Sequence, residues 1–251
     1  LIQNGNSYWI GFFVALFAGA ALGALLDVLV MRPLSNKKKT ELLSSESMRA
    51  AIPVIASLGI LGVLQALAGI IWAAEERGFP APAAQEGFTV AGSVMPFTSF
   101  DVFVISIVLI TLTMTTIFFK KTGVGLAMRA TALNQEVARL SGIRTNFTRT
   151  LSWAISGAAS SLAGLLITPT SNLSPNTLDL VLIIGFTAAV VGGLDSPAGA
   201  VLGGFIVGLV ISFVTFYLSP EDVFISILAV LLIVLIVKPR GILGGKDSRR
   251  V

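Results

Sequence analysis

Uninterrupted apolar runs recur along the whole chain, and they constrain its fold more than any other feature. A helix needs about 20 apolar residues to cross the hydrocarbon core of a bilayer, which is about 30 Å thick. The sequence therefore predicts an all-α, polytopic membrane helix bundle. The candidate spans are the seven runs 8–31, 50–74, 102–119, 150–168, 178–194, 198–218 and 223–238.

Two of these runs, 178–194 and 223–238, are marginal in length for a span. The glycine-rich stretch 178–218 therefore has two interpretations: two spans, or a broken or re-entrant helix. No loop is long enough to fold separately, so we expect residues 1–251 to form a single transmembrane domain. The chain begins at Leu1, and we interpret it as an N-terminally shortened form of a longer protein.

Composition agrees with a membrane protein and disfavours most enzyme chemistry. The chain is 55% hydrophobic and 12% charged, whereas soluble domains are about a quarter charged. It has no cysteine and no histidine. This excludes disulfide frameworks, thiol nucleophiles and zinc sites built on those ligands, and it removes the commonest general base. We therefore expect no enzymatic activity of its own, no cofactor and no metal.

Lysine and arginine residues gather in alternate loops, and this predicts how the spans are oriented. All but one of the 17 basic residues fall in the regions 32–49 and 120–149 and in the segment from Lys238 onward. Arg77 lies in the loop 75–101, among acidic residues. We expect a multi-pass protein of the bacterial plasma (inner) membrane, with the basic side and the C-terminus cytoplasmic. Contact with membrane lipid then explains the net charge of +4 without a nucleic-acid partner.

A long basic segment, 122–149, separates two of the apolar runs. Residues 125–141 have the pattern of one helix, and Gly142 suits its C-terminal cap. Apolar residues repeat along one face of this helix at spacings of three and four: Leu126, Ala130, Leu133, Val137 and Leu140. Such a helix either lies on the membrane surface or docks into the groove of a cytoplasmic partner. The periodicity alone does not separate these alternatives.

Four stretches resemble, in order along the chain, the permease subunits of branched-chain amino acid ABC transporters of the LivH type. They are DVLVMRPL (27–34), GVGLAMRATALNQEVARLSGI (123–143), GFTAAVVGGLDSPAGAVLGG (185–204) and VKPRGILG (237–244). The 185–204 match is the most specific. Members of this family usually carry further N-terminal helices, which have no counterpart in this sequence.

The resemblance implies a permease subunit of an ATP-driven importer for leucine, isoleucine and valine. Its partners would be a second permease, two cytoplasmic ATP-binding subunits, and a periplasmic or lipid-anchored substrate-binding protein. Related permeases serve urea, amides or other amino acids, so the substrate stays open. The residues themselves also allow a stand-alone secondary transporter or channel, although few ionisable residues lie within the spans.

The resemblance also implies that segment 122–149 is the coupling segment, which docks on an ATP-binding subunit. The residues expected to take part are Leu126, Arg129, Ala130, Leu133, Glu136, Val137, Arg139, Leu140 and Gly142.

Candidate residues of the translocation path lie in and before the glycine-rich stretch. Glycine and proline in 185–204 favour either close helix packing or a broken helix that lines a cavity. In the second case Phe186, Thr187, Gly192 and Gly193 would face the path. Gln65, in the middle of a span, either bonds a neighbouring helix or lines the pore.

Asp27 is the ionisable residue that lies deepest in a predicted span. A charge within the bilayer is costly, so we expect Asp27 near the inner interface. Its expected partner is Arg32 or a neighbouring subunit, and an ion or proton site is the less favoured alternative.

Overall fold

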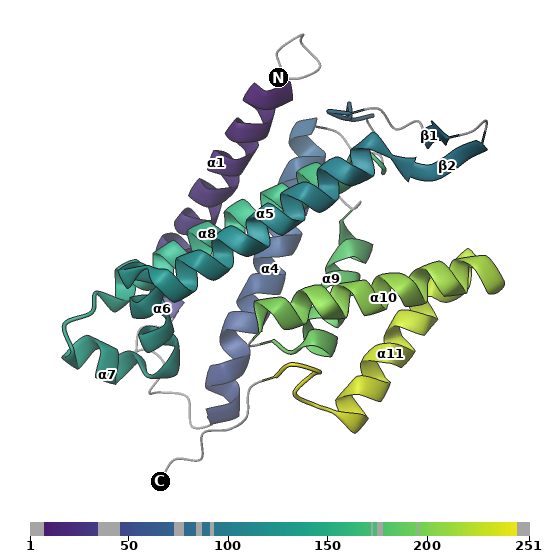
Figure 1. The fold of residues 1–251 in the computed structure, drawn as a ribbon. Coiled ribbons are helices and arrows are strands. Elements are labelled where there is room, and N and C mark those ends of the chain that lie inside the picture. Colours follow the sequence, from purple (N-terminus) through teal and green to yellow (C-terminus); the bar gives the residue numbers. More distant parts are fainter. Residues whose placement is uncertain are drawn as a thin grey trace. The chain divides into compact units, whose positions relative to one another are not determined.

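The computed structural model describes residues 8–34, 46–72, 78–83, 87–90, 93–171, 173–174, 178–194 and 196–244 (Figure 1). Its contacts divide the chain into two compact units, Leu1–Asn176 and Thr177–Val251, hereafter unit 1 and unit 2. Each unit is described by itself.

Unit 1 consists of helices and one short hairpin. Its elements are α1 (Tyr8–Leu26), the π-helical turn η2 (Asp27–Met31), α2 (Arg32–Leu34), α4 (Glu46–Trp72), β1 (Gly87–Val90), β2 (Ser93–Thr98), α5 (Ser99–Lys121), α6 (Gly123–Leu133), α7 (Gln135–Leu140) and α8 (Thr145–Ile167).

Unit 2 is helical throughout its described residues. Its elements are α9 (Asp179–Gly192), α10 (Pro197–Tyr217), the 3₁₀ turn η3 (Pro220–Asp222) and α11 (Val223–Val237). Its core is formed by Ala188, Val191, Val207 and Ile227, which come from all three long helices.

In the part of the chain that the structure describes, six helical segments are long and apolar enough to cross a membrane. They are Tyr8–Leu34, Ile52–Trp72, Ser99–Lys121, Thr145–Ile167, Ala198–Tyr217 and Pro220–Val237. They expose many large apolar side chains, as helices facing lipid do. The predicted polytopic helix bundle is confirmed.

The seventh expected span, 178–194, corresponds to the shorter helix α9. With 14 residues it is about 21 Å long, less than the thickness of the hydrocarbon core. It ends at Gly192, and α10 begins after a short turn that is capped by the Ser196 hydroxyl, which accepts from the Gly199 N–H at 3.0 Å. The stretch 178–218 is therefore two helices with a break between them, and one of the two is short.

The α1–α8 contact is built on glycine. Gly19 and Gly23 form a small-xxx-small pair on α1 and face Gly157 on α8. A Cβ atom at Gly23 would collide with the Trp153 carbonyl, and one at Gly157 with the Gly19 carbonyl. The two helices therefore pack backbone to backbone, as small residues allow in membranes.

The loop predicted over 75–101 contains an antiparallel hairpin that the sequence analysis did not anticipate. Strands β1 and β2 pair with Gly87 opposite Thr98 and Val90 opposite Ser93. Thr98 then caps α5, because its hydroxyl accepts from the Asp101 N–H at 3.1 Å while the Asp101 carboxylate accepts from the Thr98 N–H at 2.8 Å. Residues 75–77, 84–86 and 91–92 of this loop lie outside the described residues.

Candidate functional site

Within the predicted coupling segment 122–149, residues 123–140 form two short helices, and the prediction of one continuous helix over 125–141 is wrong. Asn134 has extended backbone angles, φ −155° and ψ 108°, so α6 ends before it. Its side-chain oxygen accepts from the N–H groups of Glu136 at 3.0 Å and Val137 at 3.1 Å. Asparagine is among the best N-cap residues, and here it starts α7.

The predicted apolar face is exposed on both helices. Leu133 is 85% exposed and Leu140 is 88% exposed, and Leu126 and Val137 are also exposed. The residues that pack inward are instead Gly125, Met128 and Ala138. Ala130 is half-buried, and Arg129, Glu136, Arg139 and Gly142 are exposed. Unit 1 therefore leaves this apolar surface available for a partner or for the membrane surface.

Helix α6 is held closely against its neighbours. The Thr122 hydroxyl donates to the Phe118 carbonyl at 2.6 Å and accepts from the Gly125 N–H at 3.0 Å. Gly125 lies so near the end of α5 that a Cβ atom there would collide with the Phe118 carbonyl. The hydroxyls of Thr131 and Thr148 meet at 3.2 Å and join α6 to α8. A displacement of α6 would thus be passed to α5 and α8.

The end of α7 is fixed by the glycine that the sequence analysis chose as a cap. Gly142 has φ +82°, a conformation that favours glycine. Its N–H donates to the Arg139 carbonyl at 3.1 Å, and the Ile143 N–H donates to the Ala138 carbonyl at 3.0 Å. These two bonds form a Schellman motif, which ends α7 and sets the direction in which α8 begins.

A buried carboxylate lies beside the first turns of α8. Asp27 is 0% exposed. The Arg149 Nε lies 2.9 Å from its Oδ1, a charge contact rather than an aligned hydrogen bond, and the Arg32 Nε lies 3.4 Å from its Oδ2. The Thr150 hydroxyl donates to Oδ2. The network joins η2 and α2 to α8.

The expected pairing of Asp27 with Arg32 is confirmed, whereas Arg149 was not anticipated as a partner. Arg149 and Thr150 stand more than 120 residues from Asp27 in the chain, so no local pattern could have shown the contact. Arg32 also donates to the Asn146 carbonyl at 3.3 Å, which adds a second link to the same turn of α8.

The four path candidates in unit 2 do not share one surface. Thr187 and Gly192 are buried, and Gly192 lies against Gly199 of α10 so closely that a Cβ atom would collide with the Gly199 carbonyl. Gly193 is buried beyond the end of α9. Phe186 is 56% exposed. Close packing explains Gly192, and a role in the path stays a prediction for all four.

Gln65 is half-buried on α4, in the other unit. Its role in the path also stays a prediction.

A short segment after α11, residues 238–244, closes the end of α9. The N–H groups of Ile242 and Leu243 donate to the carbonyls of Val191 and Gly192 at 2.8 and 2.9 Å. These carbonyls belong to the last turn of α9, where a carbonyl group has no hydrogen-bond donor within the helix. Gly193 has φ +108°, and a Cβ atom on it would lie 2.7 Å from the Gly244 nitrogen. The VKPRGILG stretch thus has a structural role, because it caps the C-terminal end of α9.

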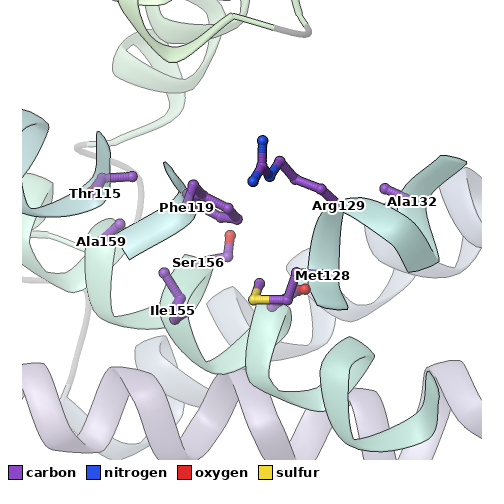
Figure 2. Close-up of a pocket in the computed structure, with 9 residues that line it drawn as sticks. Thr115, Phe119, Met128, Arg129, Ala132, Ile155, Ser156 and Ala159 are labelled. Carbon is purple, nitrogen blue, oxygen red and sulfur yellow. The ribbon is translucent and has the colours of Figure 1, made fainter. Parts of the chain in front are cut away.

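A cavity of about 360 Å³ lies within unit 1 between α5, α6 and α8. Figure 2 shows Arg129 at one edge of it and Phe119 and Ser156 on the other side. Its lining residues are Thr115, Phe119, Met128, Arg129, Ala132, Ser152, Ile155, Ser156 and Ala159. The lining is largely apolar, with a single charged residue, Arg129.

Comparison with known proteins identifies relatives along nearly the whole chain. The probable branched-chain amino acid transport permease protein LivH of Methanocaldococcus jannaschii is 36% identical over 131 residues, 49% of this chain and 42% of that protein. The high-affinity branched-chain amino acid transport system permease protein LivH of Salmonella typhimurium is 28% identical over 246 residues, 96% of this chain and 76% of that protein.

A more distant relative carries a different substrate in its name. The fructose import permease protein FruF of Bifidobacterium longum is 26% identical over 222 residues, 83% of this chain and 56% of that protein. No solved structure matches the chain.

The family described as "Branched-chain amino acid transport system / permease component" matches residues 1–237. This match includes the coupling segment, the Asp27 network and the α9–α10 pair, and it covers more than nine-tenths of the chain. Together with the six span-length helices, it shows that the chain belongs to this family of membrane transport permeases.

Proposed function

We propose that this chain is the permease subunit of an ATP-driven ABC importer for branched-chain amino acids. It forms the translocation path with a second permease, and two cytoplasmic ATP-binding subunits drive the pair. A periplasmic or lipid-anchored binding protein delivers the substrate. The observation that carries the proposal is the exposed apolar surface of α6 and α7 on a segment that is firmly attached to α5 and α8.

Docking on an ATP-binding subunit explains this surface better than contact with lipid alone. Leu126 and Leu133 lie on α6, whereas Val137 and Leu140 lie on α7, and the break at Asn134 turns the second helix away from the first. Two short helices at an angle suit a groove in a protein, whereas a helix that lies on a membrane keeps one straight apolar face.

The proposed orientation in the bacterial plasma membrane is supported by which helix ends meet and which of them carry basic residues. In unit 1, the end of α1 meets the start of α8 at the Asp27 network. The opposite end of α1 meets the start of α5, where the Trp9 and Phe103 rings lie 6.2 Å apart. The side on which α1 ends and α8 begins carries the basic residues, so we place that side in the cytoplasm. In unit 2, the segment 238–244 that bonds the end of α9 is itself basic, so the same rule supports a cytoplasmic C-terminus.

The proposed substrates are leucine, isoleucine and valine, on the strength of the names of the relatives with the highest identities. The fructose permease among the relatives shows that members of this group differ in substrate. Urea, amides and other amino acids are the alternatives, and competition against labelled leucine uptake distinguishes them.

Replacing Leu133 by Asp tests the docking surface. A carboxylate at this 85% exposed position leaves unit 1 intact but would be buried unpaired on docking, so we expect ATP-driven uptake to fall at least about tenfold. The same preparation should lose its ATP-binding subunits in affinity purification. Gln135→Asp is the matched control, because it adds the same charge at an exposed position outside the apolar face. Normal subunit retention in Leu133→Asp would refute the proposed surface.

A further inference from the structure

The cavity between α5, α6 and α8 has a largely apolar lining with one charged residue. Arg129 stands at its edge, and Figure 2 shows the Ser156 hydroxyl directed into the space between Phe119 and Arg129. Ile155 and Ala159 continue the lining along α8. They lie about 15 and 21 Å along the helix from Thr145, at 1.5 Å per residue. The cavity therefore extends from the basic end of the spans toward hydrocarbon depth.

The one charged residue in the lining is basic, and two lysines lie in the neighbouring turn of α5. Lys120 and Lys121 end α5, and Arg129 follows within the next helix. Lys120, Lys121 and Arg129 are all exposed, and no acidic residue lines the cavity. A cationic edge above an apolar lining complements a molecule with a negative head and a hydrocarbon tail. Basic pockets between membrane helices on the cytoplasmic side are known to bind such lipid head groups.

We propose that this cavity binds an anionic phospholipid of the surrounding bilayer. The phosphate lies against the Arg129 guanidinium at the edge, and the upper part of one acyl chain lies along Met128, Ile155 and Ser156. A volume of about 360 Å³ is in the range of small-molecule pockets. It holds this part of the lipid while the remaining hydrocarbon stays in the bilayer. The bound lipid would fasten α6 to α5 and α8.

The site differs from the docking surface in its residues. Leu133 and Leu140 point to solvent and do not line the cavity, whereas Met128 is buried against it. Arg129 is a predicted coupling residue and also lines the cavity, so its substitution separates docking from lipid binding.

The test uses the full-length protein in nanodiscs of phosphatidylcholine that contain a phosphatidylglycerol with a photoreactive acyl chain. We expect the lipid to crosslink to the stretch 152–159 of α8. Arg129→Gln should lower crosslinking about fivefold, the loss expected for one basic contact with an anionic lipid, and Arg129→Lys should retain most of it. Ser156→Leu, which fills the cavity without changing charge, should also abolish the crosslink.

Arg144→Gln is the matched control, because Arg144 is an exposed arginine of the same basic segment that does not line the cavity. Equal losses in Arg129→Gln and Arg144→Gln would show diffuse attraction to the membrane and overturn the proposal. So would normal crosslinking in Ser156→Leu. If Arg129→Gln instead loses ATP-binding subunits and keeps the lipid, Arg129 belongs to docking and the lipid site is wrong.

Discussion

At the scale of single residues, Asp27 joins the end of the first span to the start of α8. Its carboxylate is fully buried and contacts Arg32, Arg149 and Thr150. The arginine side chains are partly exposed, 35% for Arg32 and 23% for Arg149. They keep part of their hydration while the carboxylate has none, so the ion pairs must offset its desolvation. These contacts therefore hold the end of α1 against the start of α8.

Substituting Asp27 by Asn should destabilise the protein by about 3 kcal/mol, because it leaves two converging arginines without their counter-charge. Thermal unfolding of the purified protein in nanodiscs measures the loss. Glu221→Gln, which removes an exposed carboxylate, should change the stability by less than about 0.5 kcal/mol. If Asp27→Asn melts like the control, the network contributes no stability.

The close contact between the end of α9 and the segment 238–244 depends on Gly193. Its φ of +108° and the nearby Gly244 nitrogen leave no room for a side chain. Gly193→Ala should cost about 1–3 kcal/mol and reduce uptake. Gly208→Ala adds the same methyl group to α10, where nothing lies within 4 Å, and should be tolerated. Equal stability of the two variants, measured by thermal unfolding, would contradict the role of Gly193.

At the scale of elements, the coupling segment shows what periodicity can and cannot predict. The spacing of Leu126, Leu133 and Leu140 identified side chains that are exposed, because an apolar face without an internal partner has the same pattern as a packed one. The spacing did not identify the break at Asn134. The break arises because the Asn134 side chain, in place of a helical carbonyl, accepts from backbone N–H groups, and apolar periodicity does not report this. Asn134 followed by Glu136 was the local signal for a new helix start.

Substituting Asn134 by Ala should weaken the break. It removes the side-chain oxygen that accepts from Glu136 and Val137, at a cost of about 0.5–2 kcal/mol, and it favours one straight helix over 123–140. We expect a longer distance between spin labels at positions 126 and 140 and weaker retention of ATP-binding subunits. Asn134→Ser retains a capping oxygen and should keep the native distance. An unchanged distance in Asn134→Ala would show that α5 and α8, rather than the cap, set the angle.

At the scale of the whole molecule, apolar run length predicted the helix bundle, because a bilayer requires helices of a certain length. It could not predict that α1 and α8 pack through Gly23 and Gly157, since partners far apart in sequence leave no local trace. For the same reason the segment 238–244 was noticed only as a resemblance. The roles of Phe186, Thr187, Gly192, Gly193 and Gln65 depend on which surfaces would face the proposed second permease, and they stay predictions.

The measurement that tests the central claim most directly is purification of the full-length protein from its native membrane in a gentle detergent, with mass spectrometry of whatever remains bound. We expect two ATP-binding subunits and a second permease in the complex, and labelled leucine uptake in proteoliposomes only when ATP is supplied. A chain that purifies alone and moves solute without ATP would contradict the account and favour a stand-alone secondary transporter or channel.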